Sequence, residues 1–230
     1  MRRGRGSLLL VAFGLAAAVD LGSLAGGFTS GHVVAKPLLV PLLAAYTYAC
    51  GGPRLLLAAL LFGWGGDVLL LSGAEPAFLA GMGSFAMGHV CYLVLFGKVG
   101  KSRKTRQLPY GVVYGFAYVF ALVAAVVSLW PGLPADLRLP VAGYSALLTA
   151  MAWAATRAGL VAGLGGALFV VSDMLIATGV AEWPQPPRPD LWIMLTYLAA
   201  QYLLVQGVLR NLGTRSASTP AYGEMSTNSA

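Results

Sequence analysis

Long runs of apolar residues, separated by short stretches rich in glycine, proline or charge, follow one another along almost the whole chain. The apolar residues are continuous within each run rather than alternating, which favours helices over the strands of a transmembrane barrel. Most runs have ~17–22 residues, enough for a helix to cross ~30 Å of hydrocarbon at ~1.5 Å per residue. The pattern predicts an all-α membrane protein with eight transmembrane helices, at residues 7–25, 33–50, 54–72, 78–97, 109–130, 138–156, 160–180 and 190–210.

The predicted helices form one domain over residues 1–212. Residues 213–230 are rich in Ser and Thr and lack the apolar content needed to fold, so we expect a disordered tail. The first apolar run follows several arginines, as the core of a secretory signal would. We expect it to remain as a membrane helix, because Asp20 directly after it is a poor start for a mature chain.

Composition supports a membrane protein rather than a soluble one. Of 230 residues, 58% are hydrophobic and 10% are charged, against about 25% charged in an ordinary soluble domain. The net charge of +7 would suggest nucleic acid as a partner of a soluble protein. Here the basic residues lie in short loops, where they orient the helices and contact anionic lipids, so we expect no nucleic-acid partner.

Lys and Arg are distributed unevenly between the two sides of the predicted bundle. With the N-terminus in the cytosol, twelve of the fifteen fall in cytosolic segments, five of them in the loop 98–106. The other three, Lys36, Arg138 and Arg188, fall outside. Positive charge is enriched in cytosolic loops of membrane proteins, so both termini are predicted to be cytosolic.

Two aspartates, Asp67 and Asp173, interrupt the most apolar stretches. A charge near the bilayer centre costs at least ~3 kcal/mol, so an intramembrane acid is a functional hypothesis by default. The alternative for each is a protonated carboxyl that only packs and hydrogen-bonds between helices. Two acids in matched contexts favour the functional interpretation.

Both aspartates lie about 13 residues into their predicted helices, which places them at one depth, ~20 Å from the cytosolic boundary. The helix after each runs back inward and brings polar side chains to middle depth: His89, Tyr92, Tyr197 and Gln201. The correspondence of helices three and four with seven and eight suggests a parallel 4+4 internal repeat.

Two further residues have open interpretations. Lys36, at the outer end of the second predicted helix, could hold a phosphate, pair with an aspartate, or extend to the interface as lysines often do. His89 could relay protons or partner Asp67, or be a packed, hydrogen-bonded histidine.

The chain lacks the GxSxG, HExxH and Walker A motifs, and its two histidines alone cannot build a usual zinc site, so serine-hydrolase and zinc-hydrolase chemistry have no support.

Several segments together resemble one known family. They appear in the family's order: KPL at 36–38, FGWGGDVLLL at 62–71, FLAGMGSFAMGHVCYL at 78–93, YSALLTAM at 144–151, GALFVVSDMLIA at 166–177 and TYLAAQYLL at 196–204. The chain is similar to the lysoplasmalogenase family of membrane proteins, the YhhN-like group. The resemblance implies an eight-helix hydrolase that cleaves the vinyl ether bond of lysoplasmalogens to a fatty aldehyde and glycerophosphocholine or glycerophosphoethanolamine. It also implies that Asp67 and Asp173 carry the chemistry.

The chemistry of that reaction agrees with a pair of carboxyls. A vinyl ether is hydrolysed by protonation of its β-carbon, and water captures the resulting oxocarbenium ion. Burial and mutual repulsion favour one proton shared by two carboxyls, which supplies an acid and an anion without a metal or cofactor. Glycosidases place a similar cation between two carboxylates. The sequence does not tell which aspartate is the acid. His89, Tyr92, Tyr197 and Gln201 would orient the carboxyls and water, and Lys36 would meet the substrate phosphate.

Two other functions use the same features. A proton-coupled transporter or channel would use the aspartates as proton carriers, although no pair of interrupted helices is evident. A structural or lipid-scaffolding protein would leave the two acids unexplained. The polar tail and the basic loop 98–106 resemble an animal member, which implies the endoplasmic reticulum. Glycine-rich helix faces fit either close packing within the fold or a homodimer.

Overall fold

The computed structural model describes residues 2–102 and 110–217, and within them every regular element is an α-helix. There are eight in this part of the chain: α1 Arg2–Gly26, α2 Thr29–Ala49, α3 Arg54–Leu70, α4 Glu75–Ser102, α5 Tyr110–Leu129, α6 Arg138–Thr156, α7 Leu160–Val180 and α8 Pro189–Ala217. The all-α prediction and the number of helices are confirmed.

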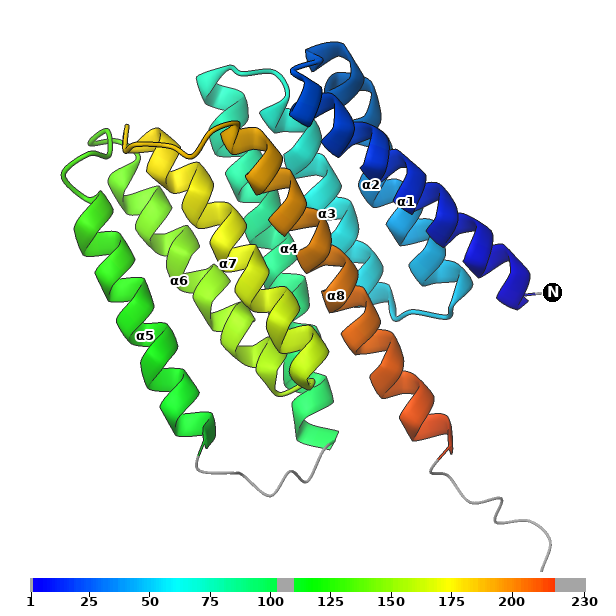
Figure 1. Cartoon of the computed structure of the whole chain (residues 1–230). Coiled ribbons are helices and arrows are strands. Elements are labelled where there is room, and N and C mark those ends of the chain that lie inside the picture. Colours follow the sequence, from blue (N-terminus) through cyan, green and yellow to red (C-terminus); the bar gives the residue numbers. More distant parts are fainter. Residues whose placement is uncertain (1, 103–109, 218–230) are drawn as a thin grey trace, which may run out of the picture.

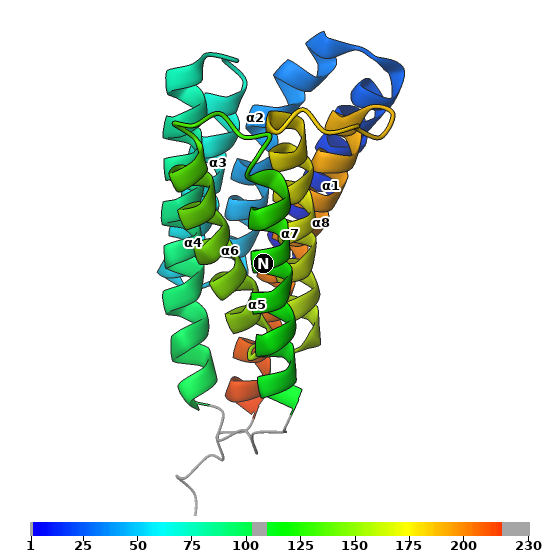
Figure 2. The ribbon, with the colours of Figure 1, turned by 90° about the vertical axis from the view of Figure 1, so that its left-hand side faces the viewer.

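The helices run up and down in one bundle (Figure 1). Consecutive helices form three closely packed pairs, α1 with α2, α3 with α4, and α7 with α8. α6 lies between α4 and α7, and α8 also contacts α1. α5 stands at one edge of the bundle, where it contacts α6 and α7, while α1 and α2 lie at the other edge (Figures 1 and 2).

Helix boundaries differ from the sequence prediction mainly at polar ends. α2 begins at Thr29 rather than at 33, so Lys36 lies two turns inside this helix. α8 continues to Ala217, so the predicted domain boundary at 212 falls within it, and residues 218–230 of the predicted tail lie outside the described residues. The basic loop is described only as far as Ser102, the end of α4.

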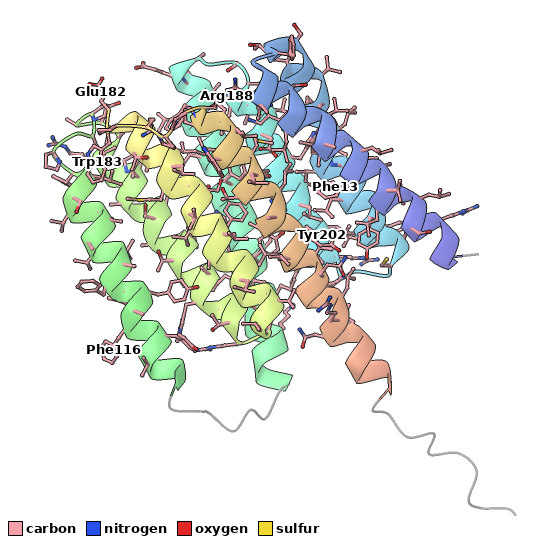
Figure 3. The ribbon with its side chains drawn as sticks, viewed as in Figure 1. Phe13, Phe116, Glu182, Trp183, Arg188 and Tyr202 are labelled. Atoms are coloured by element: carbon pink, nitrogen blue, oxygen red, sulfur yellow. The ribbon has the colours of Figure 1, made fainter. Side chains whose placement is uncertain are left out.

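Five of the described helices are long and apolar enough to cross a membrane: α1, α4, α6, α7 and α8. The described apolar part of α5, Val113–Leu129, is shorter, and α3 has only 17 residues. Large apolar side chains cover the outside of the bundle; Phe116, for example, points away from α5 and is 73% exposed (Figure 3). Such a surface is typical of an integral membrane protein, whose outer face meets lipid tails rather than water.

The main core lies where α2, α3, α4, α6, α7 and α8 meet. It contains fully buried side chains such as Leu43, Leu60, Phe96 and Leu204, together with the polar residues described below. A smaller cluster of Leu129, Leu133, Val141 and Ala181 lies between α5, α6 and α7, at the end of the bundle where α5 ends and α6 begins. The core therefore surrounds the polar residues with apolar groups on several sides.

Candidate functional site

Asp67 is buried on α3, at the fourteenth position of that helix. Its Oδ2 accepts a hydrogen bond of 2.7 Å from the hydroxyl of Tyr197 on α8. Tyr197 in turn accepts one of 3.1 Å from the amide of Gln201, whose carbonyl oxygen accepts one of 2.7 Å from Tyr92 on α4. Hydrogen bonds thus link three of the four polar side chains predicted at middle depth, Tyr92, Gln201 and Tyr197, in a series that ends on Asp67.

Two glycines of α3 make this arrangement possible. A Cβ at Gly63 would lie 3.0 Å from the Gln201 amide nitrogen, and one at Gly66 would lie 2.4 Å from the ring of Phe85. A larger residue at Gly66 would push the ring, and α4 with it, away from α3. The Gly66-Asp67 step therefore places the carboxyl against both α4 and α8.

Asp173 occupies the fourteenth position of α7 and is half-buried. Its Oδ2 accepts a short hydrogen bond from the hydroxyl of Tyr144 on α6. The Tyr144 oxygen lies 3.0 Å from Nε2 of His89 on α4. Because Tyr144 gives its only proton to Asp173, it accepts the Nε2 proton of His89, which leaves Nδ1 of the ring without a hydrogen-bond partner among the described residues. His89 therefore belongs with Asp173, through Tyr144, rather than with Asp67.

Aromatic rings connect the two carboxyl groups. Phe169 packs edge-on against His89, with ring centroids 4.7 Å apart, and against Tyr197, at 5.5 Å. Phe85 packs edge-on against Tyr197 at 5.9 Å. Tyr197, which donates to Asp67, and His89, which is linked to Asp173 through Tyr144, therefore pack against the same phenylalanine, Phe169. The hydrogen-bonded partners of the two aspartates meet at this aromatic cluster.

Lys36 is half-buried on α2. The neighbouring turn is irregular, because Pro41 has no N–H to donate to the carbonyl of Pro37. The indole of Trp64 on α3 donates to that carbonyl instead, at 2.9 Å. This bond ties α3, the helix of Asp67, to α2 beside Lys36.

An apolar pocket lies between α5 and the face formed by α4, α6 and α7. Its empty volume is about 1070 Å³, which includes the space at its open side. Asp173 and Tyr144 contribute polar groups to its lining, and so does Arg138, the first residue of α6. Phe85 also lines the pocket, whereas Asp67 and Lys36 do not. One carboxyl therefore lines the pocket, and the other does not.

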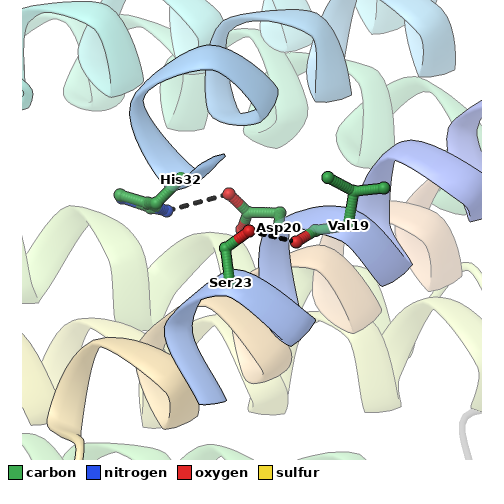
Figure 4. A network of polar contacts seen from close by, with 4 residues as sticks. All are labelled: Val19, Asp20, Ser23 and His32. Atoms are coloured by element: carbon green, nitrogen blue, oxygen red, sulfur yellow. Dashed lines mark hydrogen bonds and ion pairs between the residues drawn. The ribbon is translucent and has the colours of Figure 1, made fainter. Parts of the chain in front are cut away.

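Two buried polar residues are not among the site residues predicted from the sequence. Tyr144 lies in the segment YSALLTAM, but a tyrosine in an apolar helix gives no strong signal of function. Asp20, at the end of the first apolar run, is fully buried, and His32 Nδ1 lies 2.8 Å from its Oδ1 (Figure 4). The other oxygen, Oδ2, has no partner among the described residues. The cost of burying an acid, the argument that singled out Asp67, applies equally to Asp20.

The chain is similar to several curated proteins. Lysoplasmalogenase TMEM86B of Homo sapiens is 34% identical over 161 residues, which is 70% of this chain and 66% of that protein. Lysoplasmalogenase TMEM86B of Rattus norvegicus is 31% identical over 191 residues, 82% of this chain and 77% of that protein. Lysoplasmalogenase TMEM86A of Bos taurus is 32% identical over 157 residues, 63% of this chain and 61% of that protein. No solved structure shows significant similarity to the chain.

The family comparison covers most of the helical bundle. The model of the YhhN family matches residues 31–208, from the start of α2 to the middle of α8. The match includes Asp67, Asp173 and all of their hydrogen-bonded partners described above. The chain therefore belongs to the YhhN family.

Proposed function

We propose that this protein is a lysoplasmalogenase, a membrane hydrolase that cleaves the vinyl ether bond of lysoplasmalogens to a fatty aldehyde and glycerophosphocholine or glycerophosphoethanolamine. The observation that carries the proposal is Asp173, a carboxyl in the lining of an apolar pocket. A second carboxyl, Asp67, is linked to it through Tyr197, Phe169, His89 and Tyr144. The names of the relatives support the same activity.

Asp173 is the proton donor in this mechanism, because it is the carboxyl that lines the pocket. It transfers its proton to the β-carbon of the vinyl ether, and the electrons of the C=C bond form the new C–H bond. The oxocarbenium ion that results is stabilised by the anionic Asp67, whose charge acts strongly in a low-dielectric site.

Water then completes the reaction. Its oxygen adds to the oxocarbenium carbon, and the proton that it loses reaches Asp67, the general base, through a second water, because Asp67 does not line the pocket. The hemiacetal collapses to the aldehyde and the free hydroxyl of the glycerol, and the proton held by Asp67 is returned through water to Asp173. One water is consumed and both carboxyls regain their starting states.

The remaining polar residues act as positioning residues. Tyr144, supported by His89, orients the carboxyl of Asp173. Tyr197, supported by Gln201 and Tyr92, does the same for Asp67.

Two aspartates at equal positions of α3 and α7 support the parallel repeat, although their tyrosine partners, on α8 and α6, do not follow it. All eight helices cross the endoplasmic reticulum membrane, with both termini cytosolic.

Isotope incorporation tests the reaction. The purified protein in detergent, given lysoplasmalogen in D₂O, should release aldehyde that carries one deuterium on carbon 2, because the proton added to the β-carbon comes from solvent through Asp173. Mass spectrometry of the aldehyde, trapped as it forms, measures this. The matched 1-O-alkyl lipid, which has no C=C bond to protonate, should release nothing. A proton-coupled transporter or a scaffold protein would release no aldehyde in either case.

Tyr144→Phe should lower kcat about 10- to 100-fold, because the variant loses the hydrogen bond to the negative charge that develops on Asp173 as it gives up its proton, and leaves the Nε2 proton of His89 without its acceptor. Initial rates of aldehyde release would measure the loss. Tyr114→Phe, on the exposed face of α5, is the matched control and should keep full activity. If Tyr144→Phe releases aldehyde as fast as Tyr114→Phe, the Tyr144 hydroxyl does not contribute to the reaction.

A further inference from the structure

Arg138 is the basic residue in the lining of the pocket. It begins α6 and is half-buried, with its Nε–H donating to the carbonyl of Leu133 at 3.2 Å. Its guanidinium carbon lies 5.8 Å from the centre of the Trp130 ring. No carboxylate of the described residues forms a salt bridge with it. The loop and the indole therefore hold a cation in place while its two terminal amino groups remain free to bind an anion in bidentate fashion.

The distance between Arg138 and the candidate acid fits a lysophospholipid. Arg138 precedes Tyr144 by six residues on α6, a rise of about 9 Å, and Tyr144 donates its hydrogen bond to Asp173. In an extended lysoplasmalogen, six single bonds of about 1.5 Å separate the vinyl carbon that carries the ether oxygen from phosphorus. The direct distance between these two atoms is about 7–8 Å, because the bonds follow a zigzag. A vinyl ether at Asp173 would thus place the phosphate within reach of the arginine side chain.

The rest of the pocket fits the other end of the same molecule. Beyond Tyr144, the lining continues inward along α6 to Leu148 and Thr149, and across to Val170 on α7 and Leu122 on α5. These groups are mostly apolar, as a hydrocarbon chain requires. From the start of α6 inward, the lining therefore has a cation with the apolar Leu133 and Val141 beside it, then an acid, and then an apolar end. The phosphate, vinyl ether and chain of the lipid follow one another in the same order.

We propose that Arg138 binds the phosphate of the lysophospholipid and so positions the vinyl ether at Asp173. The proposal rests on the proposed function and identifies the group that recognises the head of the substrate. Lys36, which the sequence suggested for this role, does not line the pocket. The interaction is with the phosphate, common to choline and ethanolamine lipids, so Arg138 does not discriminate between those two head groups.

Binding of substrate analogues that cannot be hydrolysed tests the proposal independently of catalysis. The full chain in detergent would be titrated with 1-O-alkyl-glycerophosphocholine and with 1-O-alkylglycerol of the same chain length. Wild type should prefer the phospholipid, and Arg138→Gln should bind it about 10- to 100-fold more weakly, with unchanged affinity for the alkylglycerol. Arg138→Lys keeps the charge but not the bidentate geometry and should lie between them.

Arg188→Gln is the matched control, because Arg188 is an exposed arginine of the loop before α8 and lies outside the pocket lining (Figure 3). It should leave both affinities unchanged. Equal affinity of wild type for the two lipids, or an equal loss of both in Arg138→Gln, would overturn the proposal; the second result would mean that Arg138 only supports its loop. If wild type binds as expected but releases no aldehyde, the proposed function fails while the phosphate site stands.

Discussion

Asp173→Asn is expected to lower kcat for aldehyde release about 1000-fold, the range typical of a lost general acid. An amide has nearly the same shape as the carboxyl, and its oxygen can still accept the hydrogen bond from Tyr144. It has no acidic proton to give to carbon, however, so the first chemical step loses its donor. Single-turnover measurements with lysoplasmalogen in detergent would follow this step directly.

A matched control and a binding measurement make the result specific. Asp190→Asn, at an exposed aspartate in the first turn of α8, should keep wild-type activity. Asp173→Asn itself should bind the 1-O-alkyl lipid normally, since the pocket keeps its shape. Activity within tenfold of wild type would mean that another group protonates the substrate.

Asp67→Asn is expected to lower kcat about 100- to 1000-fold, the size of effect seen when a preorganised electrostatic group is removed. The variant should also change the pH profile of kcat. In wild type, activity should rise with pH as Asp67 ionises and fall at higher pH as Asp173 loses its proton, which gives a bell. Without the Asp67 carboxylate the rising limb should disappear and the falling limb remain.

The double variant distinguishes one coupled pair from two independent residues. If both carboxyls serve the same step, Asp67→Asn combined with Asp173→Asn should be about as slow as Asp173→Asn alone. Losses that multiply, or a bell-shaped profile retained by Asp67→Asn, would contradict the shared role. Thermal unfolding of each variant would check that the bundle remains intact.

The helices, and the equal level of Asp67 and the polar side chains of α8, could be predicted from the sequence because both depend on distance along the chain. Apolar runs of sufficient length define helices in lipid, and a fixed rise per residue gives the height of each side chain. This reasoning placed Asp67 level with Tyr197 and Gln201, which the structure joins by hydrogen bonds. It was less accurate where helices continue beyond their apolar part, as α8 does.

Contacts between neighbouring helices could not be predicted in this way. Which face of a helix meets which neighbour depends on packing, so the contact of α4 with α6 was not evident. That contact links His89 to Tyr144, and thereby to Asp173 rather than to Asp67. The pairing of Asp20 with His32 depends in the same way on how α1 lies against α2.

The position of α5 at the edge of the bundle has a consequence for how the protein meets its substrate. The pocket lies between α5 and the rest of the bundle and is partly open to the surroundings, which in a membrane are lipid tails. A lysolipid can then enter sideways from its own leaflet, and the aldehyde can return the same way. Under this arrangement the rate follows the mole fraction of substrate in the membrane, so that diluting the bilayer with other lipids slows turnover although the bulk concentration stays constant.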